Sequence, residues 1–158
     1  MDRDEILRVL RAFQAEQVEY VLIGAAAMGF HGLVRATEDL DLIVRPTSDN
    51  IERLRRALRS VYAADPSIDE IQTEDLLGEY PAVRYYPPSG DLYFDILTRL
   101  GEAATYDSVE SEEKEIAGTV AIVATPLALF RLKKDTLRPL DHQDAAALKA
   151  MFGLKDEE

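Results

Sequence analysis

Cysteine is absent from the sequence, and histidine occurs only twice. Without cysteine, the chain cannot form disulfides, build a thiolate zinc site or use a catalytic thiol, which agrees with a cytoplasmic protein. The sequence also lacks internal repeats, low-complexity tracts, a Walker loop, a Rossmann fingerprint and a Ser-His-Asp order. These absences exclude several common enzyme classes and leave carboxylates as the main candidates for chemistry.

Basic residues are scarce beside acidic ones: 18 lysines and arginines stand against 30 aspartates and glutamates, for a formal net charge of −12. A surface of this sign repels long polyanions, so general DNA or RNA binding through charge is not expected. A local positive surface would suit a nucleoside triphosphate better than a duplex. One segment gathers arginines that could form such a surface or simply a solvated helix face: Arg45, Arg53, Arg55, Arg56 and Arg59.

Long apolar runs are missing as well. The longest, Val21 to Phe30, contains two glycines and is too short to span a bilayer, and the charged N-terminus lacks the apolar region of a signal peptide. We therefore expect a soluble, cytoplasmic protein with no membrane partner. A hydrophobic fraction of 47% over 158 residues is enough for one core, so residues 1–158 are expected to form a single domain.

The most informative stretch runs from Tyr20 to Val44. An apolar strand ends at Gly24, small residues predict a short helix, and a second apolar strand carries Asp39 and Asp41 two positions apart. Side chains alternate along a strand, so both carboxylates point to one face. They repel each other unless a cation lies between them, and Mg²⁺, or Mn²⁺ in its place, is the natural choice. A solvated strand edge is the alternative interpretation.

A third aspartate, Asp95, lies in an apolar strand predicted over Leu92 to Leu97, after another strand over Ala82 to Tyr86. A carboxylate between Phe94 and Ile96 needs a partner, because an unpaired buried carboxylate is costly. A backbone group or Arg84 could be that partner, and a further possibility comes from the family resemblance described below.

The remaining elements follow from periodicity and from capping signals. Apolar side chains at helical spacing predict a first helix, and Asp49 to Glu52 has the form of a capping box for another. Thr125-Pro126 favours a helix start, and Gly153 a helix stop. The predicted ranges are a helix over 4–17, a hairpin over 109–116 and 119–123, and C-terminal helices within about 125–153.

Two blocks of residues resemble the DNA polymerase β nucleotidyltransferase superfamily, and within it the AbiEii-type toxins and the minimal nucleotidyltransferases of bacteria. The first block comprises Gly24-Ala25, Gly32, Arg35, Thr37, Asp39 and Asp41. The second comprises Lys133 followed by Arg138, Asp141 and Asp144. The resemblance implies an α/β (α+β) nucleotidyltransferase fold, in which helices flank a mixed, mainly antiparallel sheet and a helix pair ends the chain.

The resemblance also implies roles for these residues. Asp39, Asp41 and Asp95 would be catalytic and would hold the metal, while the nucleotide would contact Gly24, Ala25, Arg35, Thr37, Lys133, Arg138 and Asp141. Family members commonly carry Gly-Gly or Gly-Ser where this chain has Gly24-Ala25, so only a backbone N–H is available there for phosphate. Alternatives stay open: Arg35 could pair with an acid, and Lys134 could replace Lys133. His31 has no partner in the sequence and is expected to be a packing or capping residue rather than a ligand.

These observations predict a metal-dependent enzyme that transfers a nucleoside monophosphate from a triphosphate to an acceptor hydroxyl. The acceptor could be an RNA end, a protein side chain or an antibiotic. Two alternatives belong to other classes of protein: a toxin–antitoxin component that acts by binding a cognate protein, and a member of the fold that binds nucleotide without turnover.

Overall fold

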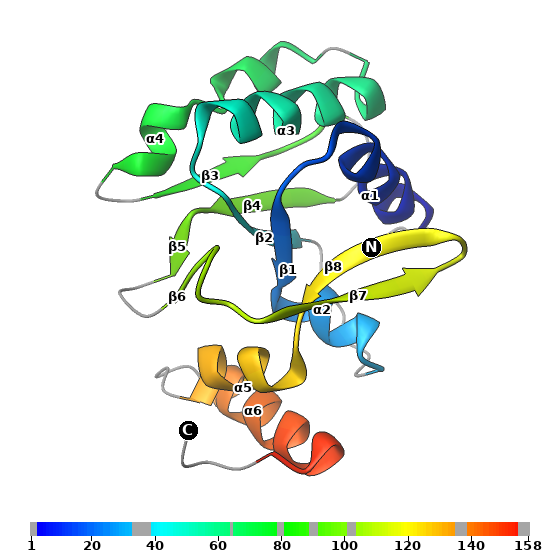
Figure 1. Ribbon diagram of the computed structural model, residues 1–158, viewed down its shortest axis with the longest axis vertical. Helices are drawn as coiled ribbons and strands as arrows, with labels where there is room; N and C mark the ends of the chain where they lie inside the picture. The colour runs from blue at the N-terminus through cyan, green and yellow to red at the C-terminus, as the bar shows by residue number, and fades with distance from the viewer. Residues whose placement is uncertain are drawn as a thin grey trace.

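The computed structural model describes residues 3–32, 39–63, 65–78, 81–88, 92–100, 104–134 and 139–154. Its centre is a six-stranded sheet with the order β3-β4-β2-β1-β8-β7 (Figure 1). The strands are β1 (Tyr20–Ile23), β2 (Asp39–Val44), β3 (Ala82–Tyr85), β4 (Tyr93–Leu97), β7 (Ser111–Ile116) and β8 (Thr119–Ala124). Three of the five pairings are antiparallel, whereas β2 with β4 and β1 with β8 are parallel. The prediction of a mixed, mainly antiparallel sheet is confirmed.

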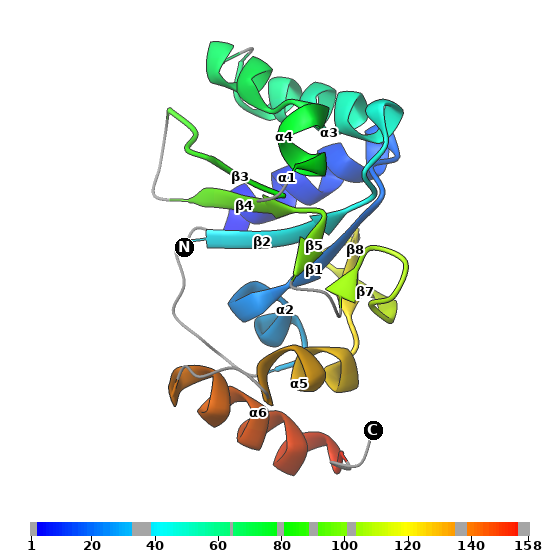
Figure 2. The same cartoon turned by 90° about the vertical axis from the view of Figure 1, so that its left-hand side faces the viewer.

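Helices lie on both sides of this sheet. Figure 2 shows α1 (Arg3–Glu16) and α3 (Ser48–Val61) on one side, with α2 (Gly24–Phe30), α5 (Pro126–Lys134) and α6 (Pro139–Phe152) on the other. The remaining short elements are a 3-10 helix η1 (Pro66–Glu70), α4 (Thr73–Leu77), and the two-stranded pair β5 (Arg99–Leu100) and β6 (Ala104–Thr105). None of the helices in the described ranges has the length and apolar character needed to cross a lipid bilayer.

The alternation of β2 decides which face of the sheet is core. Leu40 and Leu42 are fully buried and belong to the same apolar cluster as α1 and α3. Asp39 and Asp41, one position out of phase, are only partly buried on the opposite face. Burial of the leucines fixes the register of the strand, because a slip by one residue would send the carboxylates into the core.

Local capping explains where two helices begin. The Thr47 hydroxyl accepts a hydrogen bond of 3.2 Å from the backbone N–H of Asn50, so Thr47 caps α3 and the expected capping box at Asp49 does not start the helix. The prediction for α5 is confirmed, because the Thr125 hydroxyl accepts from the N–H of Ala128 at 3.1 Å and Pro126 is the first helical residue. Gly153, directly after α6, has a φ of +62°, which is the conformation typical of a glycine that ends a helix.

Candidate active site

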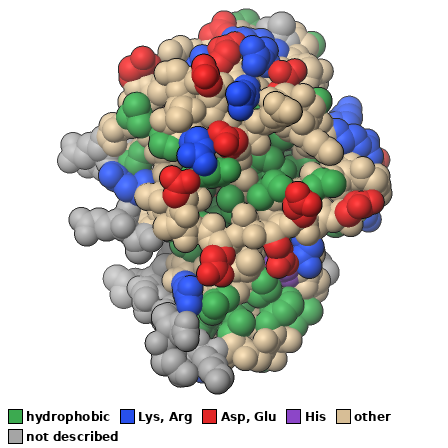
Figure 3. Space-filling view, viewed as in Figure 1, with side chains coloured by type: hydrophobic (Ala, Val, Ile, Leu, Met, Phe, Trp, Pro, Cys, Tyr) green, Lys and Arg blue, Asp and Glu red, His purple; other side chains and the backbone are tan. Residues whose placement is uncertain are grey.

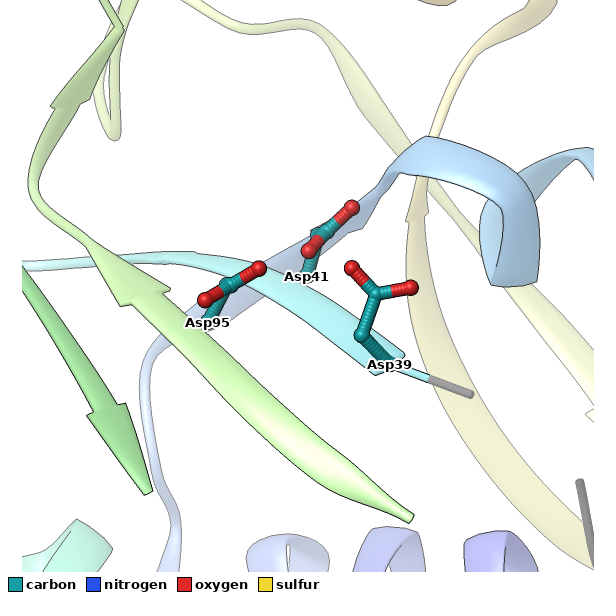
Figure 4. A group of neighbouring side chains, drawn as sticks. All are labelled: Asp39, Asp41 and Asp95. Atoms are coloured by element: carbon teal, nitrogen blue, oxygen red, sulfur yellow. The ribbon is translucent and has the colours of Figure 1, made fainter. Parts of the chain in front are cut away.

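Three carboxylates from two neighbouring strands lie together on the face that bears α2 (Figure 4). Asp39 and Asp41 come from β2, and Asp95 of β4 is the direct register partner of Asp41 in the parallel pairing. The closest set of oxygens, one from each side chain, lies within 4.8 Å of one another. The sheet therefore brings together residues that are more than fifty positions apart, and Asp95 lies where the family resemblance implied.

The neighbouring carboxylates perturb the ionisation of Asp41. The pKa of Asp41 is raised to about 8, first because burial disfavours its charged form and then because Asp39 and Asp95 repel that charge and share hydrogen bonds with it. Carboxylate oxygens at this spacing are the ligands that Mg²⁺ and Mn²⁺ prefer. A divalent cation would also remove the repulsion that raises this pKa, so the donor set fits such an ion.

Gly24 is required by its conformation and by its contact with Asp41. Its φ is +72°, in the left-handed region, and a Cβ on this residue would lie 2.2 Å from Oδ2 of Asp41. Ala25 follows it in the first turn of α2 and is partly buried. The junction of β1 and α2 thus leaves room for the central carboxylate, which explains in physical terms why a glycine begins the short helix.

Asp95 has a second neighbour on the other side. The Arg84 guanidinium donates from Nε to Oδ1 of Asp95 at 2.7 Å and from Nη2 to Oδ2 at 3.5 Å. The two partners that the sequence left open for Asp95 therefore occur together, because its side chain faces the other aspartates while Arg84 of β3 pairs with it from the outer strand. The Arg84 side chain is about half exposed, at 52%, so water screens this ion pair.

A separate cluster of charged groups joins the two C-terminal helices. Nζ of Lys133 on α5 lies 3.3 Å from Asp141 and 3.1 Å from Asp144, both on α6. All three side chains are largely buried, with 14%, 12% and 7% exposed. The pairing of Lys133 with these acids was not predicted, although Asp141 and Asp144, three residues apart at a helix start, share one face of α6 and could have indicated it.

Of the other residues singled out in the sequence, the structure describes His31 but not Arg35, Thr37 or Arg138. His31 is buried, donates from Nε2 to the carbonyl oxygen of Ala124 at 2.7 Å, and packs against the ring of Phe152. This environment is that of a packing residue, which is the interpretation the sequence favoured.

The arginines near α3 do not form a concentrated basic face. Figure 3 shows acidic and basic side chains intermixed over the top of the molecule, where α3 lies. Arg55 pairs with Glu52 at 2.8 Å, and Arg56 pairs with Glu16 at 3.2 Å. Arg45 lies between Glu19 and Asp107. Paired charges of this kind suit the solvated-face interpretation better than a phosphate site.

Comparison with known proteins adds a family and a fold. The sequence model of the family described as "Nucleotidyl transferase AbiEii toxin, Type IV TA system" matches residues 6–121. That range includes the three carboxylates and Gly24, and it ends before Lys133 and Asp141. No curated protein matches the sequence significantly.

Solved structures of nucleotidyltransferases share the fold. The crystal structure of ANT(2″)-Ia with adenylyl-2″-tobramycin has a TM-score of 0.55 at 16% identity, covering 94% of this chain and 87% of that one. The solution structure of the same antibiotic-resistance factor has a TM-score of 0.53 at 17% identity, covering 95% of this chain and 83% of that one. TM1012 of Thermotoga maritima, described as "a putative nucleotidyltransferase", has a TM-score of 0.50 at 14% identity, covering 97% of this chain and 96% of that one. The fold prediction is confirmed.

Gly24→Ala is expected to destabilise the protein and to displace the Asp41 carboxylate, because the new methyl group would overlap Oδ2 and the backbone would remain at positive φ. We expect a loss of about 2 kcal/mol or more in the free energy of unfolding. Gly29→Ala is the matched control within α2, since a Cβ there meets no atom within 4 Å. Equal stability of the two variants in thermal or urea unfolding would contradict this role for Gly24.

Without divalent cations, stability should fall with rising pH across the range set by Asp41. Its pKa is about 8 in the folded protein, against about 4 in an unfolded chain, so the folded state holds an extra proton between these values. The contribution of this proton uptake to the stability of the folded protein is fully present below pH 4 and is lost as the pH rises to about 8. Asp41→Asn should flatten this part of the profile, as measured by urea unfolding in chelator; an unchanged slope would contradict the raised pKa.

Proposed function

Because the chain belongs to the AbiEii nucleotidyltransferase toxin family, we propose that it transfers a nucleoside monophosphate from a nucleoside triphosphate to an acceptor hydroxyl. The observation that supports this activity most strongly is the convergence of Asp39, Asp41 and Asp95 within 4.8 Å on one sheet face. In the proposed reaction the acceptor oxygen forms a bond to the α-phosphorus, the bond between that phosphorus and the α–β bridging oxygen breaks, and pyrophosphate leaves with the electron pair.

Asp39 and Asp41 are proposed to hold Mg²⁺ or Mn²⁺, with Asp95 as a further ligand. A divalent cation in this position supplies charge neutralisation for the triphosphate and polarises its phosphorus–oxygen bonds. The carboxylates contribute the positioning, since β2 and β4 fix them in register before any ligand arrives. This rigid placement is the kind of preorganisation that electrostatic catalysis requires.

Asp95 is the proposed acceptor of the proton that the attacking hydroxyl loses. It stands at the side of the group nearest β3, and Arg84 holds its carboxylate in one orientation through the 2.7 Å hydrogen bond. We therefore propose that the acceptor approaches from the β3 side. The triphosphate would lie toward Gly24 and Ala25, with Arg35, Thr37 and Arg138 as further contacts.

Lys133 and Asp141 are proposed to complete the nucleotide site from the C-terminal helices. The buried pairing of Lys133 with Asp141 and Asp144 changes what its removal would do, because a variant without the lysine leaves two largely buried carboxylates without this cation. A loss of nucleotide affinity in Lys133→Ala is therefore informative only when the free energy of unfolding is measured alongside it.

A toxic effect on the host cell is the proposed biological role of this activity. The matching family is described as the toxin of a type IV toxin–antitoxin system, which supports an effect on growth that a cognate antitoxin relieves. The solved relative ANT(2″)-Ia carries an adenylylated antibiotic, which supports a hydroxyl acceptor in general without fixing its class. Growth arrest on expression, abolished by Asp41→Asn, is the expected phenotype.

Asp39→Asn and Asp41→Asn should each lower nucleotide transfer by roughly a thousandfold or more, because each removes a charge from the proposed metal site. Pyrophosphate release is measured with each of the four triphosphates, in Mg²⁺ and in Mn²⁺. Glu113→Gln, an exposed acid on β7, is the matched control for loss of one negative charge and should keep full activity.

Two results would contradict this proposal. Wild-type rates in both aspartate variants would mean that the carboxylate group is not the reaction centre. Triphosphate binding in calorimetry without pyrophosphate release, across RNA, protein and antibiotic acceptors, would favour a nucleotide-binding protein without turnover.

A further inference from the structure

His31 has one ring nitrogen that is buried without a hydrogen-bond partner. The side chain is 1% exposed, and its Nε2 donates to the carbonyl oxygen of Ala124 at 2.7 Å. Its Nδ1, on the other side of the ring, has no hydrogen-bond partner among the described residues. A buried polar atom in this state costs free energy, so it calls for a structural or functional reason.

The carbonyl oxygen of Ala124 determines which nitrogen of the neutral ring carries the proton. Because that oxygen can only accept, the neutral ring keeps its hydrogen on Nε2, and Nδ1 presents a lone pair. Oε1 of Glu112 lies 3.7 Å from Nδ1, so the lone pair of the neutral ring faces a carboxylate. A second proton, placed on Nδ1, gives both ring nitrogens an acceptor and makes an ion pair with Glu112.

The groups around the ring act on its charge in opposite directions. Burial disfavours a positive ring, because a buried cation loses its water. Glu112 favours it, and the side chain of this residue is 40% exposed, so it has room to close the remaining gap. Nζ of Lys114 lies 3.4 Å from the same carboxylate oxygen and competes for it. The adjoining α2 and β8 carry no charged residue, whereas the helices beyond them carry cations, among them Arg131 on α5 and Lys149 on α6.

Contacts of His31 tie α2 to the C-terminal helices. The residue directly follows α2, and in Figure 1 this end of α2 lies between the β7–β8 hairpin and the end of α6. Its Nε2 hydrogen bond reaches the last residue of β8, next to the Thr125 cap of α5. Its ring meets that of Phe152 on α6 edge to face, with the centroids 5.8 Å apart. We refer to His31, Glu112, Ala124 and Phe152 together as the histidine clasp.

The clasp joins the two parts of the molecule that are proposed to enclose the triphosphate. α2 begins at Gly24, beside Asp41, and so presents its first turn to the carboxylate group. Lys133 and Asp141, the proposed contacts from the C-terminal helices, lie on α5 and α6. The position of these helices relative to α2 therefore sets whether both sides reach one nucleotide.

We infer that the histidine clasp is a proton-operated latch: the protonated ring of His31 binds Glu112 and holds the C-terminal helices against α2, which favours binding of the triphosphate. The positive ring also strengthens the hydrogen bond to Ala124. The latch follows from the contacts of His31, whereas its effect on the triphosphate rests on the proposed function. His31 touches no nucleotide in this arrangement and is a positioning residue. Histidine side chains ordinarily change charge between about pH 5 and 8, so the latch responds to pH in that range.

Stability measured without ligand tests the latch itself. Glu112→Gln removes the acceptor of the ion pair, and Glu113→Gln, one position on and exposed, is the matched control. The ion pair exists only while the ring is charged, so its stabilisation is present at about pH 6 and is lost as the pH rises to about 8.5. In chelator, the thermal midpoint of Glu112→Gln should lie about 2 to 4 °C below that of the wild type at pH 6, and within about 1 °C of it at pH 8.5. The titration of Asp41 is common to all three proteins and cancels in these differences.

Nuclear magnetic resonance of the imidazole nitrogens tests the tautomer. The chain has two histidines, so His142→Gln, a change at an exposed residue of α6, leaves His31 as the only source of imidazole signals. At high pH the ring should carry its proton on Nε2, and at low pH it should carry a proton on both nitrogens. A neutral ring with its proton on Nδ1 would contradict the hydrogen bond to Ala124 and overturn the latch.

Triphosphate affinity tests the link to the nucleotide site. His31→Gln keeps an N–H donor for the Ala124 carbonyl and cannot acquire a charge. Calorimetry with Mg²⁺ and a non-hydrolysable triphosphate analogue is carried out at pH 6 and at pH 8.5 in the wild type, His31→Gln and His142→Gln. The ratio of wild-type affinity to His31→Gln affinity should be about fivefold larger at pH 6 than at pH 8.5, which is the lower end of ordinary coupling between sites. His142→Gln should match the wild type at both pH values.

The possible results separate the latch from the proposed function. Equal midpoints of the wild type and Glu112→Gln at pH 6 overturn the latch, and so does the same deficit at both pH values, which is the result of a purely structural contact. A pH-dependent midpoint with an affinity ratio that does not change with pH overturns the link to the nucleotide and leaves the transfer reaction standing. Absence of analogue binding in all three proteins counts against the proposed function, while the midpoints still decide on the latch.

Discussion

The mutual repulsion of three carboxylates on adjacent strands is the constraint on which the rest of this site depends. A protein that places Asp39, Asp41 and Asp95 within 4.8 Å gives up stability at neutral pH unless a proton or a cation lies between them. Burial, and then repulsion from Asp39 and Asp95, raises the pKa of Asp41 to about 8, which reflects that cost. Such a cost is typical of a functional site, because a structural role would be served better by apolar residues.

Several neighbouring residues reduce the repulsion among the three carboxylates or hold them in position. The leucines that alternate with the aspartates hold β2 in register, and the parallel pairing with β4 sets Asp95 opposite Asp41. Gly24 leaves the space that the Asp41 carboxylate occupies. Arg84 neutralises the outermost carboxylate from β3 and leaves the inner pair to be balanced by another cation. These residues come from four separate elements, namely β2, β3, β4 and α2, so the site depends on how one half of the sheet and the short helix pack together.

Much of this arrangement could be predicted from the sequence, for physical reasons that apply to particular residues. Alternation of apolar and acidic side chains in β2 predicted the strand and the shared face of Asp39 and Asp41. The place of Asp95 beside them was implied by the resemblance to the nucleotidyltransferase superfamily. The Thr125-Pro126 pair predicted the start of α5. Such signals are local, because each depends on the periodicity or capping chemistry of a few neighbouring residues.

The parts that could not be predicted depend on contacts between distant segments. Whether Asp95 would pair with Arg84 or face the other aspartates looked like a choice, and only the strand order β3-β4-β2 shows that one carboxylate can do both. The contact between the rings of Tyr86 and Tyr93 also depends on tertiary structure. Thr47 replaced Asp49 as the cap of α3, because two capping residues lay close together and the backbone geometry selected the earlier one.

The central claim is that the three aspartates form a binding site for a divalent cation that receives a nucleoside triphosphate. The most direct test is anomalous diffraction from crystals grown with Mn²⁺ and a non-hydrolysable triphosphate analogue. The account predicts a manganese peak coordinated by Asp39 and Asp41, with Asp95 beside it and the phosphates of the analogue in contact with the ion. Bound analogue with manganese at another position, or no manganese among the three carboxylates at saturating concentration, would contradict it.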